Sequence, residues 1–473
     1  MSRSIAAIMA VASCASLAHA QVPGRYGGIA DLIVGNRQGL AASPPGPAAG
    51  QAGGAVTAPI AQPGPVPSFP TQAPISGPPS PGVVLTPRTG PLPSTLTLEQ
   101  ALEEAVARAP AIVAAQADVE ASRGRLRQAG FRPNPQLSVD VENFAGGGAY
   151  REVGNGLQTT VTINQQLDLF GRRSARVNAA QAALAAQEVR LAIARADLGQ
   201  AVRTQFAGAV AARDRLRLAT DNLGRARELA RIADELVAAG REPPLRGLRA
   251  RANAAQAEAA LRAAEAVEIA TRRTLAGLFG VAGEVGNVSG PLIPASLAAI
   301  EPAATLEVRL AEVERLQAEA SLRQEQVARR LNPSVGVGVR RLEQTNDTAL
   351  VAGVSVPLPL FDRNQGNVAA AQASIRAAQA RRDAALAVAT ARIGNARSNL
   401  GAAQARVTAL ETAALPQASE ALRLANLAYR AGRLTLLELL DAQAALTATQ
   451  GDLIDARAAL AEASATLVRA AAQ

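Results

Sequence analysis

The sequence predicts a mainly helical protein with a membrane β-barrel part, built from a duplicated helix–strand–strand–long helix–helix unit. Three observations support this fold class. The chain repeats itself after roughly 190 residues, four short segments alternate apolar and polar residues, and two helical stretches each run for about 63 residues.

The first 20 residues are expected to be a signal peptide. Arg3 precedes an apolar run at 5–12, and the small residues at 18–20 (Ala-His-Ala) form a cleavage site. A chain with this leader is exported from the cytoplasm.

Cys14 and His19 are the only cysteine and the only histidine, and both lie in this leader. Cleavage after Ala20 therefore leaves a mature chain that can form neither disulfides nor imidazole or thiolate metal sites, and cannot use Cys or His in catalysis. An alternative interpretation is a lipoprotein site at 11–14, which would retain Cys14 as an acylated residue. No nucleophile-elbow or phosphate-loop motif is present, so we expect no enzymatic activity and no cofactor.

Residues 21–94 contain 16 of the 28 prolines, mixed with Gly, Ala, Ser and Thr and without apolar periodicity, which predicts a flexible extension. Helical structure is expected to begin at Thr97, which can form a capping box with Gln100, and to run to about Ala129. The first repeat is assigned to residues 95–290 and the second to residues 291–473.

The internal repeat is visible in four matched segments. Asn134-Pro135 recurs as Asn332-Pro333, LDLFGR at 167–172 as LPLFDR at 358–363, VNAAQ at 177–181 as VAAAQ at 368–372, and AGR at 239–241 as AGR at 431–433. The offsets are 198, 191, 191 and 192 residues. The offset falls from 198 to 191 because the glycine-rich turn at 145–148 of the first half is longer than the equivalent turn at 345–347 of the second half.

Four strands are predicted, at 137–143, 157–166, 334–342 and 349–358. In the first, apolar Leu137, Val139 and Val141 alternate with polar residues, which is typical of a membrane β-barrel strand. No segment after the leader has the roughly 18–20 apolar residues of a membrane-spanning helix, so insertion is expected to use these strands. Since the smallest barrels need about eight strands, closure requires several chains.

Long helices are predicted at 175–237 and 367–431, each roughly 95 Å at about 1.5 Å per residue. Shorter helices at 98–129 and 245–278 would together match one long helix, as would those at 305–331 and 434–472. Apolar positions at heptad-like spacing are expected to form the helix–helix seams: Leu424, Leu427, Ala431 and Leu434.

The formal charge of +9 falls to +8 when Arg3 is removed, and arginines are scattered along the helices rather than clustered. Aromatic residues make up 2% of the chain and tryptophan is absent. Both facts disfavour nucleic-acid binding, which needs basic patches and stacking platforms.

These residues resemble the TolC-type outer-membrane efflux proteins over about residues 96–473. The duplication and the segment at 429–443 (YRAGRLTLLELLDAQ) are similar to the family's repeat and its helix-turn-helix tip. Asn134-Pro135-Gln136-Leu137, followed by ENFAGGG at 142–148, resembles the cobalt-zinc-cadmium resistance (CzcC-like) branch.

The resemblance implies a homotrimer in the outer membrane, with a twelve-stranded β-barrel embedded in lipid and a helical coiled-coil tunnel in the periplasm. It also implies a periplasmic membrane-fusion adaptor and an inner-membrane RND pump as partners. Two features depart from the family: the long extension at 21–94, and the absence of His and Cys with which the mature chain could select a soft metal. We therefore expect the partners to choose the cargo.

Adaptor docking is expected at the two tips, where Gly240 and Gly432 end the long helices; the simpler interpretation is that these glycines only form turns. The docking residues implied by the resemblance are Gly240, Arg241, Gly432, Arg433 and Leu434.

A periplasmic gate is expected at Glu438 and Asp441, whose i, i+3 spacing places both carboxylates on one helix face. The family has acidic residues at these places, which form a cation-attracting constriction. The repeat places Arg246 and Arg249 at the equivalent positions, and we hypothesise that these arginines pair with carboxylates of a neighbouring tip. A solvated helix face is the simpler alternative.

The leading hypothesis is a passive duct for divalent heavy-metal cations (cobalt, zinc, cadmium type) in a tripartite exporter. A drug or type I secretion duct is the alternative within transport. A periplasmic coiled-coil scaffold without a pore is the alternative of another class.

Overall fold

The computed structural model describes Arg88 and residues 90–144, 156–290 and 300–473. The predicted signal peptide, Cys14, nearly all of the extension and the glycine-rich turn at 145–148 lie outside these residues. The described residues all belong to the unit that begins at Pro79.

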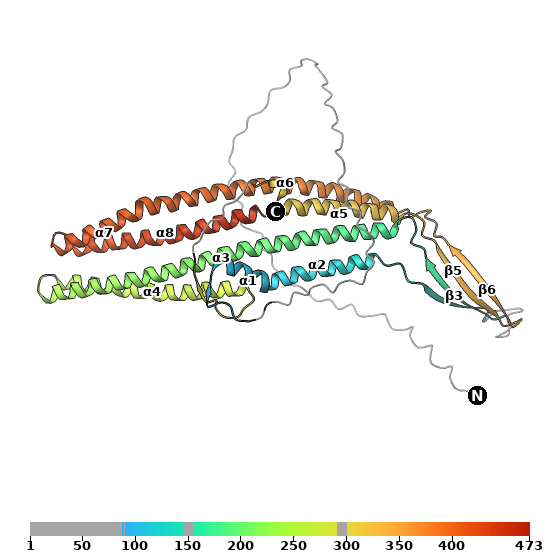
Figure 1. Ribbon diagram of the computed structural model, residues 1–473, viewed down its shortest axis with the longest axis horizontal. Coiled ribbons are helices and arrows are strands. Elements are labelled where there is room, and N and C mark those ends of the chain that lie inside the picture. The colour runs from blue at the N-terminus through green and yellow to red at the C-terminus, as the bar shows by residue number, and fades with distance from the viewer. Residues whose placement is uncertain (1–87, 89, 145–155, 291–299) are drawn as a thin grey trace, which may run out of the picture. The chain divides into compact units, whose positions relative to one another are not determined.

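The helices and strands follow the predicted repeat (Figure 1). The first half contains α1 (Leu98–Arg108), α2 (Pro110–Ala129), β2 (Gln136–Glu142), β3 (Gln158–Gln166), α3 (Arg172–Ala238) and α4 (Pro244–Leu278). The second contains α5 (Leu306–Ala328), β5 (Ser334–Leu342), β6 (Asp347–Ser355), α6 (Gln365–Ala409), α7 (Leu415–Arg430) and α8 (Leu436–Ala470). Next to the strands, α2, α3, α5 and α6 pack side by side in that order.

The single helix predicted from 98 to 129 is wrong, because it is broken at Ala109. Thr97 and Gln100 form the predicted capping box, and α1 then ends at Arg108. Ala109 has φ −58° and ψ 123°, an extended conformation, because the ring of Pro110 excludes the helical conformation from the residue before it. Pro110 then begins α2.

The second long helix contains a π-helical turn that the sequence analysis did not predict. α6 passes into this turn at Leu410–Ala414, and α7 follows directly. Pro416 lies just beyond it, and a proline lacks the N–H and clashes with the carbonyl four residues earlier, so the local hydrogen bonding must change. At the equivalent place α3 has Gly224 and remains α-helical.

The short helices are stacked end to end, as predicted. The Leu306 N–H at the start of α5 donates to the carbonyl of Ala472, just after α8, at 3.0 Å. At the matching joint of the first half, a Cβ on Gly280 would lie only 2.8 Å from Cγ of Pro110. The end of α4 therefore abuts the start of α2.

The four predicted strands form one antiparallel sheet in the order β2-β3-β5-β6. β6 covers 347–355 rather than the predicted 349–358, and β2 and β6 are the edge strands. The register aligns apolar residues across the sheet, for example Leu137, Ile163 and Val337 in one row.

One face of this sheet is apolar and exposed. Leu137 is 68% exposed, Val337 66% and Leu350 89%. The opposite face is polar, and there Arg340 donates to Thr160 Oγ1 at 3.0 Å and lies 3.7 Å from Glu142. None of the helices in the described residues is long and apolar enough to cross a membrane.

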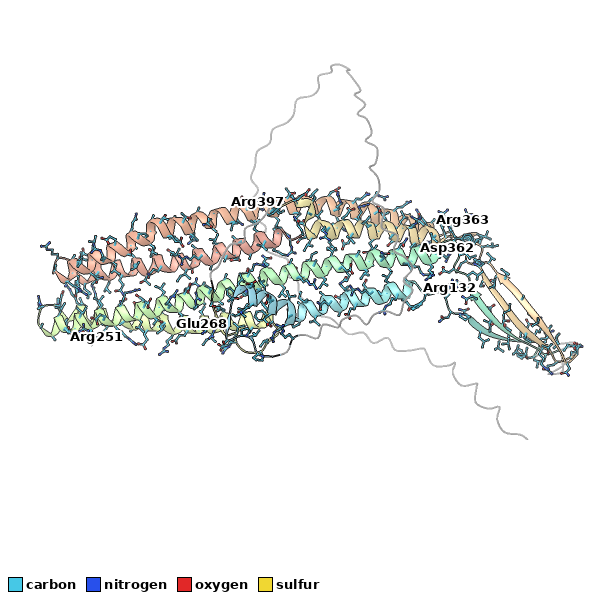
Figure 2. The ribbon with its side chains drawn as sticks, in the orientation of Figure 1. Arg132, Arg251, Glu268, Asp362, Arg363 and Arg397 are labelled. Carbon is cyan, nitrogen blue, oxygen red and sulfur yellow. The ribbon has the colours of Figure 1, made fainter. Side chains whose placement is uncertain are left out.

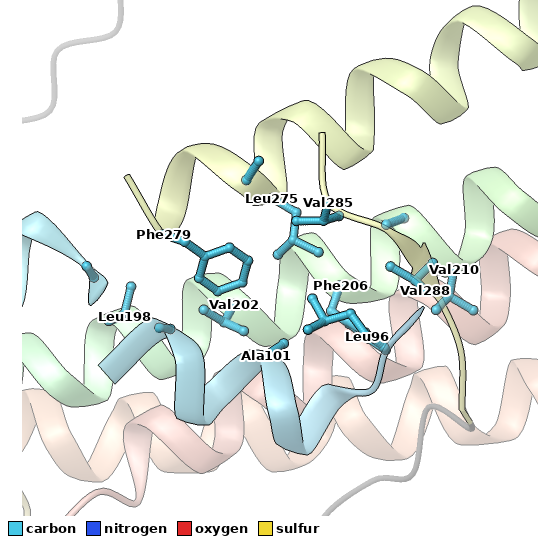
Figure 3. Close-up of a cluster of buried hydrophobic side chains, with 14 of the residues drawn as sticks. Leu96, Ala101, Leu198, Val202, Phe206, Val210, Leu275, Phe279, Val285 and Val288 are labelled. Atoms are coloured by element: carbon cyan, nitrogen blue, oxygen red, sulfur yellow. The ribbon is translucent and has the colours of Figure 1, made fainter. Parts of the chain in front are cut away.

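The largest apolar core lies in the first half, where α1, α3 and α4 meet a two-stranded parallel sheet (Figure 3). This sheet pairs β1 (Thr95–Leu96) with β4 (Asn287–Val288). Phe206 of α3 and Phe279 after α4 are at most 2% exposed within it.

The last residues of the predicted extension are attached to this core. Arg88 forms an ion pair with Glu104 at 2.8 Å, and the Ser94 carbonyl accepts from the Asn287 N–H at 2.8 Å. Arg88 and Ser94, which the prediction placed in the flexible extension, therefore both contact this core.

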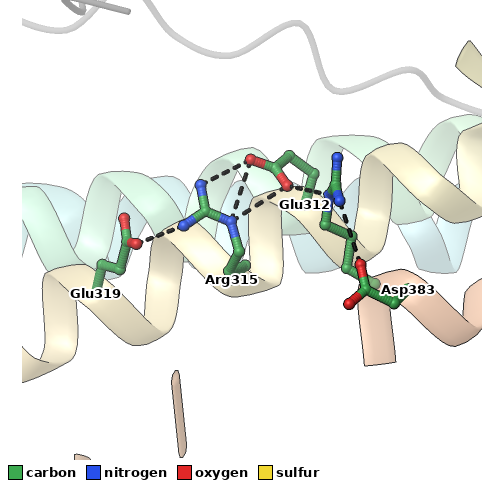
Figure 4. Close-up of polar contacts among 5 residues, drawn as sticks. Glu312, Arg315, Glu319 and Asp383 are labelled. Atoms are coloured by element: carbon green, nitrogen blue, oxygen red, sulfur yellow. Dashed lines mark hydrogen bonds and ion pairs between the residues drawn. The ribbon is translucent and has the colours of Figure 1, made fainter. Parts of the chain in front are cut away.

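The joint between α5 and α6 is polar (Figure 4). Arg315 bonds Glu312 at 2.8 Å and also pairs with Glu319, all on α5. Arg382 of α6 bonds Glu312 at 2.9 Å and Asp383 at 3.3 Å. The hydrogen bond from Arg315 lowers the pKa of Glu312, which keeps this carboxylate ionised.

Candidate functional site

The tips of the two helical hairpins α3–α4 and α7–α8 have the same backbone geometry. Gly240 has φ +69° and Gly432 has φ +68°, the left-handed conformation that glycine adopts at least cost. The Arg241 N–H donates to the Leu236 carbonyl, and the Arg433 N–H to that of Ala428, both at 2.9 Å. Each long helix therefore ends in the same capped turn.

The helices after the turns also begin in register, α4 at Pro244 and α8 at Leu436, which are 192 residues apart. Their N-caps differ. Thr435 forms a capping box with Glu438, whose carboxylate accepts from the Thr435 N–H at 2.9 Å and from its hydroxyl at 2.7 Å. Pro243 offers no side-chain cap.

The predicted gate carboxylates both lie on the first turns of α8 and are exposed. The Thr435 N–H and hydroxyl lower the pKa of Glu438, so its charge persists to lower pH than that of an ordinary glutamate. This capping role was not predicted, although Thr435-x-x-Glu438 has the same spacing as the capping box predicted at Thr97.

The structure does not bring Arg246 or Arg249 to these carboxylates within the chain. Arg246 forms an ion pair with Glu242, four residues earlier, and Glu438 is bonded to Thr435. Arg249 is exposed. No ion pair among the residues that the structure describes joins the basic tip to the acidic one. Pairing with a neighbouring subunit stays a hypothesis.

Tyr429 of α7 lies beside the Glu242–Arg246 pair of the other hairpin. It packs on a core shared by the two hairpins, which includes Leu229 of α3 and Leu439 of α8. Burial raises the pKa of the Tyr429 hydroxyl, and the nearby Glu242 carboxylate raises this pKa further. This contact was not predicted, because it joins two residues that are 187 positions apart in the sequence.

Exposed leucines surround both tips. Leu245 and Leu437, which are equivalent in the repeat, are 56% and 54% exposed. Leu424 and Leu427 are 51% and 55% exposed, so the prediction that they form seams is wrong within the chain. The face of α7 that packs inside the chain contains Leu422, Ala425 and Tyr429 instead.

Within the described ranges, no three His, Cys, Asp or Glu side chains gather in a way that could hold a metal ion.

The model of the outer membrane efflux protein family matches residues 101–281 and 299–473. The chain belongs to this family. It is an efflux channel that lies in the outer membrane, with its helical tunnel in the periplasm. This location and role favour the predicted duct over the alternative of a scaffold without a pore.

Two relatives come from metal-resistance systems. The cobalt-zinc-cadmium resistance protein CzcC of Cupriavidus metallidurans is 30% identical over 360 residues, 74% of this chain and 84% of CzcC. The nickel-cobalt-cadmium resistance protein NccC of Alcaligenes xylosoxydans xylosoxydans is 32% identical over 57% of this chain and 62% of NccC. The crystal structure of the outer membrane protein VceC of Vibrio cholerae shares the fold, with a TM-score of 0.66, 22% identity and coverage of 79% of this chain and 96% of VceC.

Proposed function

We propose that this chain is the outer-membrane channel subunit of a tripartite RND-type efflux system that exports divalent heavy-metal cations such as cobalt, zinc and cadmium. The observation that carries the proposal is the similarity to CzcC across 84% of its length. The chain acts as a passive duct in this proposal, and the energy comes from its inner-membrane partner.

Three chains form the duct in this proposal. The four-stranded sheet has an exposed apolar face, which suits lipid, and two unpaired edges, β2 and β6, whose backbone N–H and C=O groups are not stable in a bilayer unless the sheet closes. Three copies supply twelve strands, with the apolar rows facing lipid and the polar face around Arg340 lining the lumen.

The two tips are the proposed docking surface for the periplasmic adaptor. Leu245 and Leu437 each follow a capped glycine turn and expose more than half of their surface, beside Arg241, Arg433 and Leu434. Apolar side chains on rigid turns, surrounded by arginines, suit a helical partner that contributes its own apolar residues.

The gate is proposed at Glu438 and Asp441. In a trimer each residue gives a ring of three carboxylates, and acidic rings attract cations at a constriction. The capping box holds the Glu438 carboxylate at the start of α8, so that ring has a defined position. Arg246 and Arg249 on the other hairpin of a neighbouring subunit are the proposed weak latches, each worth at most about 1 kcal/mol.

Cargo choice is assigned to the partners. The described residues contain no group of three metal-ligating side chains, and the mature chain is expected to contain no His or Cys. An acidic ring distinguishes cations from anions but does not distinguish cobalt from calcium.

The cargo is tested with a deletion strain and its complemented control. We expect growth of the deletion strain to fail at lower cobalt, zinc, cadmium or nickel concentrations, with drug resistance and peptide secretion unchanged. Loss of drug resistance or of secretion alone would overturn the metal assignment and support the alternative duct.

The gate is tested by single-channel recording of Glu438→Ala plus Asp441→Ala in planar bilayers. We expect cation preference to fall and conductance to change, whereas Arg397→Ala, an exposed arginine far along α6, changes neither. Unchanged conductance and cation preference in the double variant would contradict the gate.

A further inference from the structure

The two halves of the chain join where β3 pairs with β5, and there the Leu167 N–H donates to the Pro333 carbonyl at 2.9 Å. Beside this pairing, the Arg172 guanidinium at the start of α3 donates to the carbonyls of Ala328 and Arg330, at 2.5 and 2.6 Å. Ala328 is the last residue of α5 and Arg330 follows two residues later. Arg172 therefore donates to a carbonyl that the helix leaves without a partner, and its positive charge lies at the negative end of the helix.

The two outer edges of the chain are equivalent, in the repeat, to the two sides of this joint. Adding 191 to the residue numbers of the β3–α3 junction gives the β6–α6 junction. Subtracting 198 from those of the α5–β5 junction gives the α2–β2 junction. β6–α6 and α2–β2 lie at opposite edges, since the sheet order is β2-β3-β5-β6 and the helix order is α2, α3, α5, α6.

The equivalence extends to single residues. Leu137 lies opposite Ile163 in the first hairpin and Val335 opposite Val354 in the second, and these pairs are related by the same two shifts. After the hairpins, the Leu169 N–H donates to the Leu167 carbonyl, as the Leu360 N–H does to Leu358, both at 2.9 Å.

In a closed sheet of several chains, β6 of one subunit pairs with β2 of the next. We propose that this pairing has the register of the β3–β5 pairing, with Ser355 opposite Ser138 of the neighbouring subunit, as Asn164 lies opposite Gly336 within the chain, and that an arginine clamp holds it. Arg363 donates to the carbonyls of Gly130 and Arg132 of the neighbouring subunit, as Arg172 does to Ala328 and Arg330. This inference rests on the proposed oligomeric duct and adds its strand register and its clamp.

The side chains concerned are placed for this role. Arg132 and Arg363 lie at the helix–strand junctions of α2 and α6 (Figure 2) and are exposed; neither guanidinium forms a hydrogen bond to any residue that the structure describes. The Gly130 carbonyl already accepts from Arg173 at 2.6 Å, but a carbonyl has a second lone pair. Ser138 and Ser355 both project from the polar face of the sheet, as a correct register requires.

The two junctions differ in one respect. Gly171 has φ +80° and α3 begins at Arg172, whereas the matching Asp362 is followed by Asn364 with φ +58° and α6 begins at Gln365. Arg363 therefore lies in the loop before the helix, whereas Arg172 lies in the first turn. The Arg363 side chain must reach the equivalent carbonyls from a different backbone position.

The register is tested by cysteine cross-linking in the full chain, whose only cysteine is expected to be cleaved off or acylated. Ser355 and Ser138 form a non-hydrogen-bonded pair in the proposed register, with Cα atoms about 4.5 Å apart, close enough for a disulfide. We expect Ser138→Cys plus Ser355→Cys to give a disulfide-linked trimer on non-reducing gels. Ser138→Cys plus Val354→Cys, whose side chains face opposite ways, is the matched control and is expected to stay uncross-linked.

The outcomes separate the inference from the function on which it rests. A native trimer that cross-links through Ser138→Cys plus Gly353→Cys instead would show a register slipped by two residues and overturn the inference while the duct survives. Absence of any trimer in the native protein would overturn the proposed duct itself.

The clamp is tested by the heat needed to dissociate the detergent-purified trimer. We expect Arg363→Ala to dissociate at lower temperature than Arg397→Ala, and Arg363→Lys to restore only part of the loss, since an ammonium cannot bridge two carbonyls as a guanidinium does. Equal dissociation temperatures for Arg363→Ala and Arg397→Ala would refute the clamp.

Discussion

The two halves of the chain share one backbone plan but differ in how their short helices are joined. In the first half Phe206 and Phe279 fill an apolar core between α1, α3 and α4. The position equivalent to Phe279 is Ala471, and the second half is held there by Arg469, which pairs with Asp197 at 2.5 Å and Glu307 at 2.7 Å. The two halves thus share their helix lengths and their tip turns, whereas the side-chain contacts that join their short helices differ.

The tips differ in the same way. Their glycine turns are superimposable in φ and hydrogen bonding, yet one first turn has arginines and an internal Glu242–Arg246 pair, and the other has Glu438 and Asp441 with a threonine cap. A scaffold repeated in space can therefore present opposite charges at equivalent positions. The predictions below test this contrast in stability, each measured as thermal or denaturant unfolding of the detergent-purified protein by circular dichroism.

The largest effect is expected at the first-half core. Phe206→Ala should lower the free energy of unfolding by about 3–5 kcal/mol, because Phe206 is fully buried and its removal leaves a cavity. Val407→Ala, in the smaller cluster of the second half, should cost about 2 kcal/mol, and Val202→Ala, which removes the same atoms from the first-half core, is its matched comparison and should cost at least as much. A larger loss from Val407→Ala than from Val202→Ala would contradict the greater weight of the first-half core.

The next effect concerns the two long helices. Gly224→Pro should cost about 3 kcal/mol, because α3 is regular where the second half accommodates Pro416 next to a π-helical turn. Gly224→Ala is the control and should stabilise by up to about 1 kcal/mol, since a Cβ there meets no atom within 4 Å. If Gly224→Pro were tolerated, α3 could adopt the same π-helical turn.

The tip turns should respond equally in the two halves. Gly240→Ala and Gly432→Ala should each cost about 1–2 kcal/mol, the cost of a left-handed non-glycine residue, since a Cβ at either position meets nothing within 4 Å. Unequal costs would show that one turn is strained or held by contacts that the other lacks.

The caps should respond unequally. Thr435→Ala should cost about 1 kcal/mol, because it removes the acceptor for the Glu438 N–H and a donor to its carboxylate. Pro243→Ala at the equivalent position removes no side-chain cap and should cost less. A larger loss from Pro243→Ala would reverse the contrast.

The smallest effect is the pH dependence at Glu438. The folded protein lowers the pKa of this carboxyl, so its charge stabilises the fold above the unfolded value of about 4.3, and this contribution is lost as pH falls below that value. Glu438→Gln keeps a hydrogen-bond acceptor without the charge. The wild-type advantage in unfolding temperature over this variant should be present at pH 7 and vanish in acid; an advantage that persists in acid would contradict the charge effect.

Sequence patterns predicted the elements whose cause is local. The capping box at Thr97, the glycine turns and the alternation in β2 all depend on residues within a few positions of one another, and each is present. Two local signals were available and missed: the extended residue before Pro110, and the cap at Thr435. Both follow from rules applied correctly elsewhere in the same chain.

Contacts between distant segments could not be predicted in this way. Nothing near Tyr429 in the sequence indicates Glu242, and nothing near Arg88 indicates that the extension is tied to α1. Likewise, heptad spacing identified Leu424 and Leu427 as apolar but could not show that α7 packs inside the chain through Leu422 and Ala425.

By itself the sequence determined the order of the helices and strands, the alternation of the strands and the positions of the turns, because hydrophobic periodicity and backbone conformation act over a few residues. Only the tertiary structure decided which face of each helix is buried, which charges pair and where the core lies. Those outcomes depend on which segments, nearly 200 residues apart, come into contact, as Arg172 does with the end of α5.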